Sequence, residues 1–363
     1  MEVTNKQMSL PTFLRKVAAT AASGFLLTGC ATAKTATATQ SAVSTKPACD
    51  IARATPWITK WFDAWQLTSQ RILKIPEIAN PNIVFFDGKC AYTTADLGGT
   101  APGVAGPSLG ADRFLWRAAL HGDTLTMPTS QRIPVQLLSF TDFDPKARRP
   151  FFVMASPGYW ASKGFGQEPG LTGVFLHEFT HTRQIRGLVS IIGPIDAVWS
   201  FPDELSDDAV QNHFKSDSSY VAAYLAERDL LYRAAKADSL AEVRTLALQA
   251  LGMIRARHAR WFVGDNDIFS TLDDTFLSLE GSAQWAAHAW LAHPEGGRLK
   301  KDAAVATMIG RRRIWSQDEG LGLFLVIDRL MPDWPSLVFA EPSIGGITLL
   351  ERATKELPRG RPN

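Results

Sequence analysis

Two histidines separated by three residues place the strongest constraint on how this chain can fold. His177 and His181 bracket the run His-Glu-Phe-Thr-His. On an α-helix, residues four apart lie on one face, one turn apart, so both imidazoles can reach a single metal ion. Glu178 lies beside them and can reach a water molecule on such an ion. The spacing therefore predicts a helix through this segment, with a metal site on one of its faces.

The residues around the motif support that helix. Pro169 and Gly170 precede it, and proline is favoured in the first turn of a helix. Gly187 follows it, and glycine is common just past a helix end. Residues 151–155, Phe-Phe-Val-Met-Ala, read as a strand that leads toward the helix.

Strand and helix signals are unevenly distributed along the 363 residues. Strand candidates fall in the first half, at 82–86, 90–94, 124–127, 134–140 and 151–155. Apolar spacing near 3.6 falls in the second half, at 205–214, 217–237, 239–261, 275–293 and 318–331. Strands followed by helices predict an α+β class with two lobes, an α+β lobe over 51–190 and a helical lobe over 191–363.

Composition points to an ordinary globular protein. Hydrophobic residues make up 45% of the chain and charged residues 20%, which is typical of folded domains. The formal net charge is +2, so nothing in the charge balance favours nucleic acid as a partner.

The first thirty residues read as an export signal. A basic start is followed by an apolar run over 17–27, too short to span a bilayer as a helix, and then by Leu27-Thr28-Gly29-Cys30. This pattern resembles a bacterial lipoprotein signal. The resemblance implies a signal peptide over 1–29, a lipid anchor on Cys30 and, with the neutral Ala31, the outer membrane facing the periplasm. Residues 30–50 then form a lipidated tether rich in Ala, Thr and Ser.

The other two cysteines are Cys49 and Cys90. In an exported chain, a disulfide between them is favoured over two free thiols. Such a bond would close a loop at the start of the folded part.

The segment Val174-Phe175-Leu176-His177-Glu178-Phe179-Thr180-His181-Thr182 resembles the active-site helix of the zincin metallopeptidases. The resemblance implies a Zn²⁺ cofactor, a two-lobed zincin fold, Glu178 as general base and a peptide or protein substrate. Arg183 departs from the pattern, since zincins usually carry an apolar residue there.

A catalytic zinc needs a third protein ligand, and three glutamates compete for that role. The run Glu280-Gly281-x-Ala283-x-Trp285 resembles the second helix of zinc aminopeptidases of the aminopeptidase N kind, which favours Glu280 in a gluzincin-like site. The 98 residues 182–279 are a longer gap than that family has. Glu204 lies nearer the usual spacing but sits in an acidic helix start, and Glu227 lies within a predicted helix.

Other roles stay open on the sequence. Candidates for a donor to the transition state are Tyr220, Tyr224, His213, His258, His288 and His293. Candidates for carboxylates that hold the histidines are Asp207, Asp208, Asp273 and Asp274. The alternatives to a peptidase are a lipoprotein that binds metal or a partner without catalysis, and a serine hydrolase built on Gly106-Pro107-Ser108-Leu109-Gly110.

Overall fold

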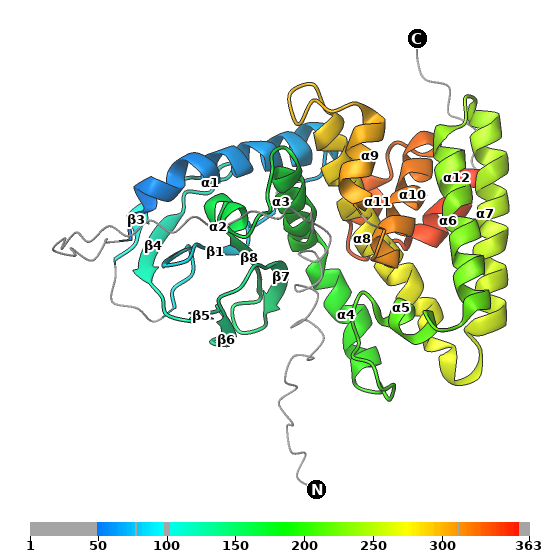
Figure 1. Ribbon diagram of the computed structural model, residues 1–363, viewed down its shortest axis with the longest axis horizontal. Helices are drawn as coiled ribbons and strands as arrows, with labels where there is room; N and C mark the ends of the chain where they lie inside the picture. The colour runs from blue at the N-terminus through cyan, green and yellow to red at the C-terminus, as the bar shows by residue number, and fades with distance from the viewer. Residues whose placement is uncertain (1–48, 77, 98–101, 311, 356–363) are drawn as a thin grey trace, which may run out of the picture.

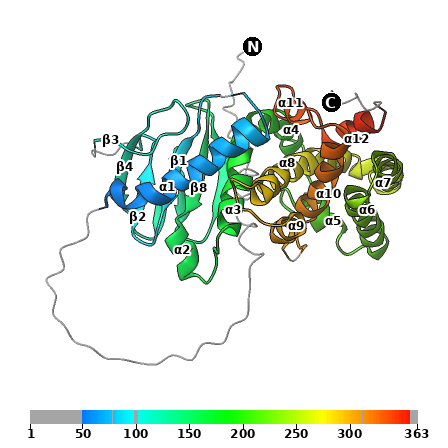
Figure 2. The ribbon, with the colours of Figure 1, turned by 90° about the horizontal axis from the view of Figure 1, so that it is seen from above.

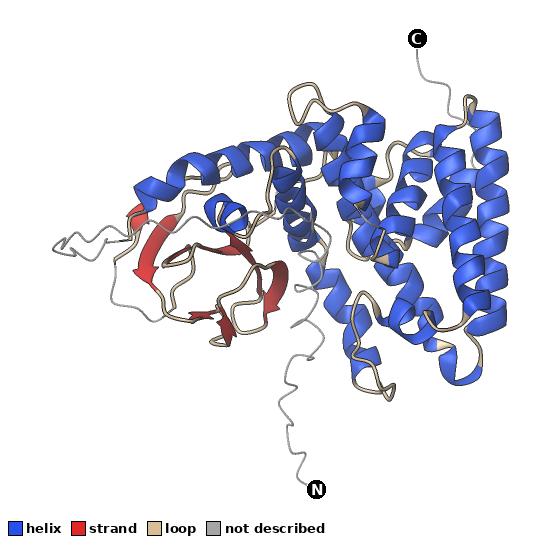
Figure 3. Cartoon of the chain, in the orientation of Figure 1, coloured by secondary structure: helices blue, strands red, loops and turns tan. Residues whose placement is uncertain are grey.

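The computed structural model describes residues 49–76, 78–97, 102–310 and 312–355. The predicted signal peptide, most of the tether and the lipidation of Cys30 lie outside these residues. Strands gather at one end of the molecule and helices fill the other, as Figure 3 shows. The predicted α+β class is therefore confirmed.

The main sheet has the strand order β3-β4-β2-β1-β8-β7 within the described residues. The strands are β1 (Asn82–Phe86), β2 (Cys90–Thr93), β3 (Val104–Ala105), β4 (Leu115–Leu120), β7 (Ser139–Asp144) and β8 (Arg149–Ala155). β1 and β8 run parallel and the other neighbours antiparallel, so the sheet is mixed. β5 (Thr124–Thr126) and β6 (Arg132–Pro134) form a separate ribbon. β7 therefore lies at a free edge, and β8 lies beside it.

One long helix crosses the sheet. α1 (Ile51–Gln66) begins at Asp50, whose side chain accepts a hydrogen bond from the backbone of Ala52, and continues into a π-helical turn over Leu67–Ile72. Figures 1 and 2 show it lying along one face of the sheet. Its Trp61 packs against Phe85 of β1, with ring centroids 5.4 Å apart. A disulfide joins Cys49, just before the helix, to Cys90 of β2, which confirms the expected pairing.

The motif helix lies between the sheet and the helical part of the molecule (Figure 1). After the short α2 (Pro157–Ser162), α3 spans Gly170–Thr180 and passes into a 3₁₀ turn over His181–Arg183. A separate helix, α4 (Ile185–Asp196), follows. Pro169 and Gly170 lie at the start of α3, as expected, and Gly187 lies past its end, although inside the next helix, α4, and not at a helix stop.

The helical part is built around α8. It contains α5 (Ala209–Phe214), α6 (Ser218–Lys236), α7 (Leu240–Trp261), α8 (Ile268–Ala292), α9 (Lys301–Ile309), α10 (Trp315–Leu330), α11 (Pro335–Val338) and α12 (Gly346–Lys355). α8 packs against α3 on the sheet side and against α10 on the other. This central helix therefore links the sheet lobe to the rest of the bundle.

Several predicted boundaries differ from the structure. The strand expected at 134–140 is wrong, since β6 ends at Pro134 and β7 begins at Ser139. α8 begins seven residues before the expected 275, and α1 was not anticipated. The division into lobes at 190/191 stays a prediction, and α4 runs across it. In the described part of the chain, no helix has both the length and the apolar character that a membrane span requires.

Candidate metal centre

Aromatic rings from α1 and β8 pack against one face of the motif helix. Phe175 of α3 stacks on Trp61 of α1, with centroids 4.9 Å apart and planes 7° from parallel. Phe179, one turn later, meets Trp65 of α1 edge to face at 5.1 Å. Phe152 of β8 completes the contact with both α3 rings. Because apolar residues three and four apart share this face, the motif histidines point to the other face.

The structure brings His177, His181 and Glu280 together. Their candidate ligand atoms all lie within 4.8 Å of one another, and no residue in the group is more than 4% exposed. Nε2 of His177 is 3.1 Å from Oε2 of Glu280, and Nε2 of His181 is 3.5 Å from Oε1. The two Nε2 atoms are 3.2 Å apart. A buried three-residue group that could hold a metal ion is therefore present.

The glutamate reaches the histidines because two helices touch through glycine. A Cβ built on Gly281 of α8 would lie 2.5 Å from the carbonyl oxygen of Gly320 on α10, and one built on Gly320 would lie 2.7 Å from Cα of Gly281. Both distances are far below carbon contact distance. The backbones of α8 and α10 can therefore meet directly behind Glu280, which fixes where its carboxylate points.

The three side chains fit a zinc ion. Two imidazole nitrogens bound tetrahedrally at about 2.0–2.1 Å lie about 3.3 Å apart. The Nε2 atoms of His177 and His181 match that separation at 3.2 Å. Two lone pairs facing each other at this distance repel, so either a proton or a metal ion must lie between the two nitrogens. Two imidazoles and one carboxylate are also a donor set that Zn²⁺ accepts.

The electrostatics of the group favour a bound cation. Burial lowers the pKa of His181 to about 4, so its ring is neutral at pH 7. Burial also opposes protonation of His177, but its hydrogen bond to Glu280 and that carboxylate's charge outweigh burial and raise its pKa. Burial alone would raise the pKa of Glu280, yet the two imidazoles outweigh it and lower the pKa to about 2. The group therefore presents an ionised carboxylate and a neutral His181 ring, the protonation states in which these side chains bind a metal ion.

Glu178 lies beside this group and is also buried. Burial raises the pKa of its carboxyl to about 8, against the opposing effect of His177. Its Oε2 atom has no hydrogen-bond partner among the described residues. The Thr141 hydroxyl of β7 donates a 2.8 Å hydrogen bond to its backbone carbonyl and so joins the motif helix to the edge strand. A cation at the adjacent group would favour the ionised form of this carboxyl.

Amide side chains, rather than the expected carboxylates, contact the candidate ligands. Oε1 of Gln184 lies 3.0 Å from Nδ1 of His181, and Nε2 of Gln184 donates to Ser282 at 2.7 Å. Nε2 of Gln317 on α10 donates to Oε2 of Glu280 at 3.0 Å, and Gln317 accepts from Gln284 at 3.0 Å. Gln184 lies three residues past the motif and could have been found from its spacing. Gln317 has no signal in the sequence, because its position depends on how α10 packs.

The other candidates lie elsewhere. Glu204 is exposed, and Glu227 forms a buried ion pair with Arg257. Within the described residues, no hydrogen bond joins the three ligands to any of the proposed donors or to the four aspartates. Burial, and after it the charge of Glu280, raises the pKa of both Asp207 and Asp208, and Glu178 also raises the pKa of Asp207. Ser108 is exposed in a loop between β3 and β4, so the strand-and-helix setting of a nucleophile elbow is missing there.

Arg183, which departs from the zincin pattern, makes contacts with α1 and with the loop before β1. Its guanidinium lies 5.5 Å from the centre of the Trp65 ring on α1. It also donates hydrogen bonds to the carbonyl of Ile78 and to the side chain of Asn80, each at 3.2 Å. The charge is therefore directed toward α1 and the loop before β1, where it ties down the turn that follows His181.

Comparison with known proteins returned no match to a family, to a curated protein or to a solved structure. The site is therefore described by its own geometry.

Proposed function

We propose that this protein is a zinc-dependent hydrolase, and specifically a metallopeptidase of the gluzincin-like kind. The observation that carries the proposal is the buried group of His177, His181 and Glu280, with the buried Glu178 carboxyl close enough to interact electrostatically with His177 and Glu280. Three protein ligands leave one position of a tetrahedral ion open, and an open position is the mark of a catalytic rather than a structural zinc.

The chemistry follows from the residue types. Bound zinc would lower the pKa of a water molecule toward about 7 and polarise the bond to be cleaved. Glu178 would take a proton from that water as general base and pass it to the departing amine. Gln184 and Gln317 would hold His181 and Glu280 in place, since contacts to the far side of a ligand orient it.

The edge strand supports a peptide as the substrate. β7 has β8 on one side, and its other side is free within the described sheet. An extended peptide can add to such an edge through main-chain hydrogen bonds. Because the Thr141 hydroxyl of β7 donates to the backbone carbonyl of Glu178 on the motif helix, a peptide on this edge would run next to the helix that carries the metal centre. We also propose that the chain acts in the cell envelope, held by a lipid on Cys30.

The test is zinc content together with hydrolysis of a quenched-fluorescence peptide library. Elemental analysis should find about one zinc per chain, lost in His177→Ala and sharply reduced in Glu280→Ala. Glu204→Ala is the matched control, because this exposed carboxylate lies outside the group. Glu178→Gln should keep its zinc and lose hydrolysis by about 100-fold or more, the range for a general base.

Two results would overturn parts of the proposal. A folded wild type that takes up no zinc, even with zinc added, would remove the metal centre. Equal peptide hydrolysis by wild type and Glu178→Gln would leave a metal site without the proposed chemistry. For the anchor, mass spectrometry of protein from a bacterial membrane fraction should find acyl chains on Cys30, and Cys30→Ala should release the protein from the membrane.

A further inference from the structure

A second group of catalytic residue types lies at the beginning of α8, away from the metal centre. The Ser270 hydroxyl oxygen is 3.2 Å from Nδ1 of His258 on α7, and Nε2 of the same ring is 2.8 Å from Oδ2 of Asp273. Ser270 and Glu280 are ten residues apart on one helix, which is about 15 Å along its axis. The two sites therefore use different ends of α8.

The carboxylate decides which ring nitrogen carries the proton. Arg257 donates a 3.0 Å hydrogen bond to the same oxygen of Asp273. Burial opposes ionisation of Asp273, but Arg257 and His258 outweigh it and lower its pKa. An ionised carboxylate only accepts hydrogen bonds, so the imidazole must donate from Nε2. In the neutral ring, Nδ1 then carries the lone pair and faces the Ser270 hydroxyl.

This is the order of contacts that activates a serine: nucleophile, base and a group that orients the base. The two ring nitrogens are used in the reverse order from the serine proteases, where the base nitrogen is Nε2. Either imidazole nitrogen can take a proton, so the chemistry permits both arrangements. The geometry, rather than any sequence motif, identifies the group, since Ser270 lies in the first turn of a helix with no elbow before it.

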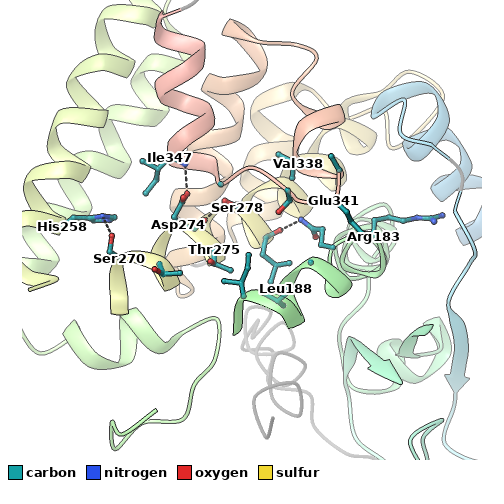
Figure 4. A pocket seen from close by; sticks show the side chains of 18 residues that line it. Arg183, Leu188, His258, Ser270, Asp274, Thr275, Ser278, Val338, Glu341 and Ile347 are labelled. Carbon is teal, nitrogen blue, oxygen red and sulfur yellow. Dashed lines mark hydrogen bonds between the residues drawn. The ribbon is translucent and has the colours of Figure 1, made fainter. Parts of the chain in front are cut away.

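The group opens on a cavity of about 470 Å³, within the range of about 300–1,000 Å³ for small-molecule sites. Figure 4 shows His258 and Ser270 joined at one side of this cavity, opposite the loop that carries Glu341. Apolar wall residues are Leu188, Ile191, Val338 and Ile347. The His258 side chain is 18% exposed and Ser270 is half-buried, so a ligand in the cavity can reach both.

We propose that Ser270, His258 and Asp273 form a serine-type acyl-transfer site for esters with a short apolar acyl group. The Ser270 oxygen attacks the ester carbonyl, and its proton passes to Nδ1 of His258. The carbon–oxygen bond to the alcohol then breaks, and the alcohol leaves with that proton. Water attacks the acyl-serine, gives a proton to Nδ1, and the carboxylic acid leaves as Ser270 regains the proton. Negative charge on the attacked carbonyl oxygen is favoured by the positive end of α8.

A fluorophosphonate probe tests the proposal on the full chain. The probe should phosphonylate Ser270, as located by peptide mass spectrometry. Ser270→Ala should abolish labelling, and His258→Gln should slow it by about 100-fold or more through loss of the base. Ser343→Ala is the matched control and should label normally, because this exposed serine lines the same cavity and is not part of the group. Thermal melting checks that each variant is folded.

The result also has to be independent of the metal centre. Labelling should persist in Glu178→Gln and after zinc is removed by a chelator, so failure of the peptidase proposal leaves this test intact. Wild type should also release a burst of about one nitrophenol per chain from a short-chain nitrophenyl ester. No label on wild type, label on Ser343, or undiminished label in His258→Gln would overturn the proposal.

Discussion

Replacing Gly281 with alanine should loosen the metal centre through the backbone. The added Cβ would lie 2.5 Å from the carbonyl oxygen of Gly320 and 2.6 Å from its Cα. Carbon atoms in contact lie about 3.5–4.0 Å apart, so α8 and α10 must separate by about 1 Å. Both sides of the contact are helix backbone, which cannot rotate away as a side chain can.

The change in unfolding free energy on Gly281→Ala is the sum of a steric cost and a gain in helix propensity. Overpacking costs about 1–3 kcal/mol, and alanine recovers about 1 kcal/mol of helix propensity over glycine. The matched control is Gly252→Ala on α7, where a Cβ meets nothing within 4 Å and only the gain remains. The two variants should therefore differ by about 2 kcal/mol in unfolding free energy, or about 4–8 °C in Tm. Because Gln317 moves with α10, its 3.0 Å hydrogen bond to Glu280 should break, with zinc affinity about 10–100-fold lower.

Thermal melting of metal-free protein measures the first quantity, and competition with a chromophoric chelator measures the second. The reasoning would be refuted if Gly281→Ala melted as high as Gly252→Ala and bound zinc as tightly as wild type. The contact between glycines would then have no part in directing Glu280. A loss of stability without any loss of zinc affinity would separate the packing of α8 on α10 from the ligand geometry.

Three further predictions concern Gln317, His288 and the Cys49–Cys90 disulfide. Gln317→Leu should lower zinc affinity about 10-fold or more with little change in metal-free stability, and equal affinity would remove Gln317 from the metal centre. Burial lowers the pKa of His288 to about 4 in the folded protein. As pH falls from 6.5 to 4, the unfolded chain therefore binds a proton on His288 before the folded protein does, and up to about 3 kcal/mol of the free energy of unfolding is lost. Urea unfolding of His288→Leu should show a flatter pH dependence over this range, and an unchanged slope would contradict the cause. Replacing both Cys49 and Cys90, 41 residues apart, with serine should lower the unfolding free energy by about 4 kcal/mol, and a Tm equal to wild type would refute the loop-closure account.

The parts of the site that follow a local period were predictable. His177 and His181 share a face because of helical spacing, and the resemblance around Glu280 favoured the residue that lies nearest them in the structure. The edge strand was placed poorly. The apolar pattern at 134–140 favoured a strand there, whereas the backbone turns after Pro134 and the paired residues begin at Ser139.

The remaining features depend on tertiary packing. α1 was not expected from the sequence, yet its Trp61 and Trp65 hold the motif helix from behind. The carboxylates proposed to hold the histidines were chosen for their chemistry, but the amide of Gln184 contacts His181, and Nδ1 of His177 has no hydrogen-bond partner among the described residues. Gln317 reaches Glu280 only because Gly281 and Gly320 let two helices touch, a contact between residues 39 positions apart that no local pattern records.

The Cys49–Cys90 disulfide and the proposed metal centre would act as two cross-links that break under different conditions. The disulfide joins the start of α1 to the sheet and opens only to a reductant. A metal ion on His177 and Glu280 would clamp the sheet lobe to the bundle across about a hundred residues of chain, and would open to acid or a chelator. Under oxidising conditions with too little zinc, the junction between the sheet lobe and the bundle would therefore loosen first. The disulfide between the start of α1 and β2 would stay intact.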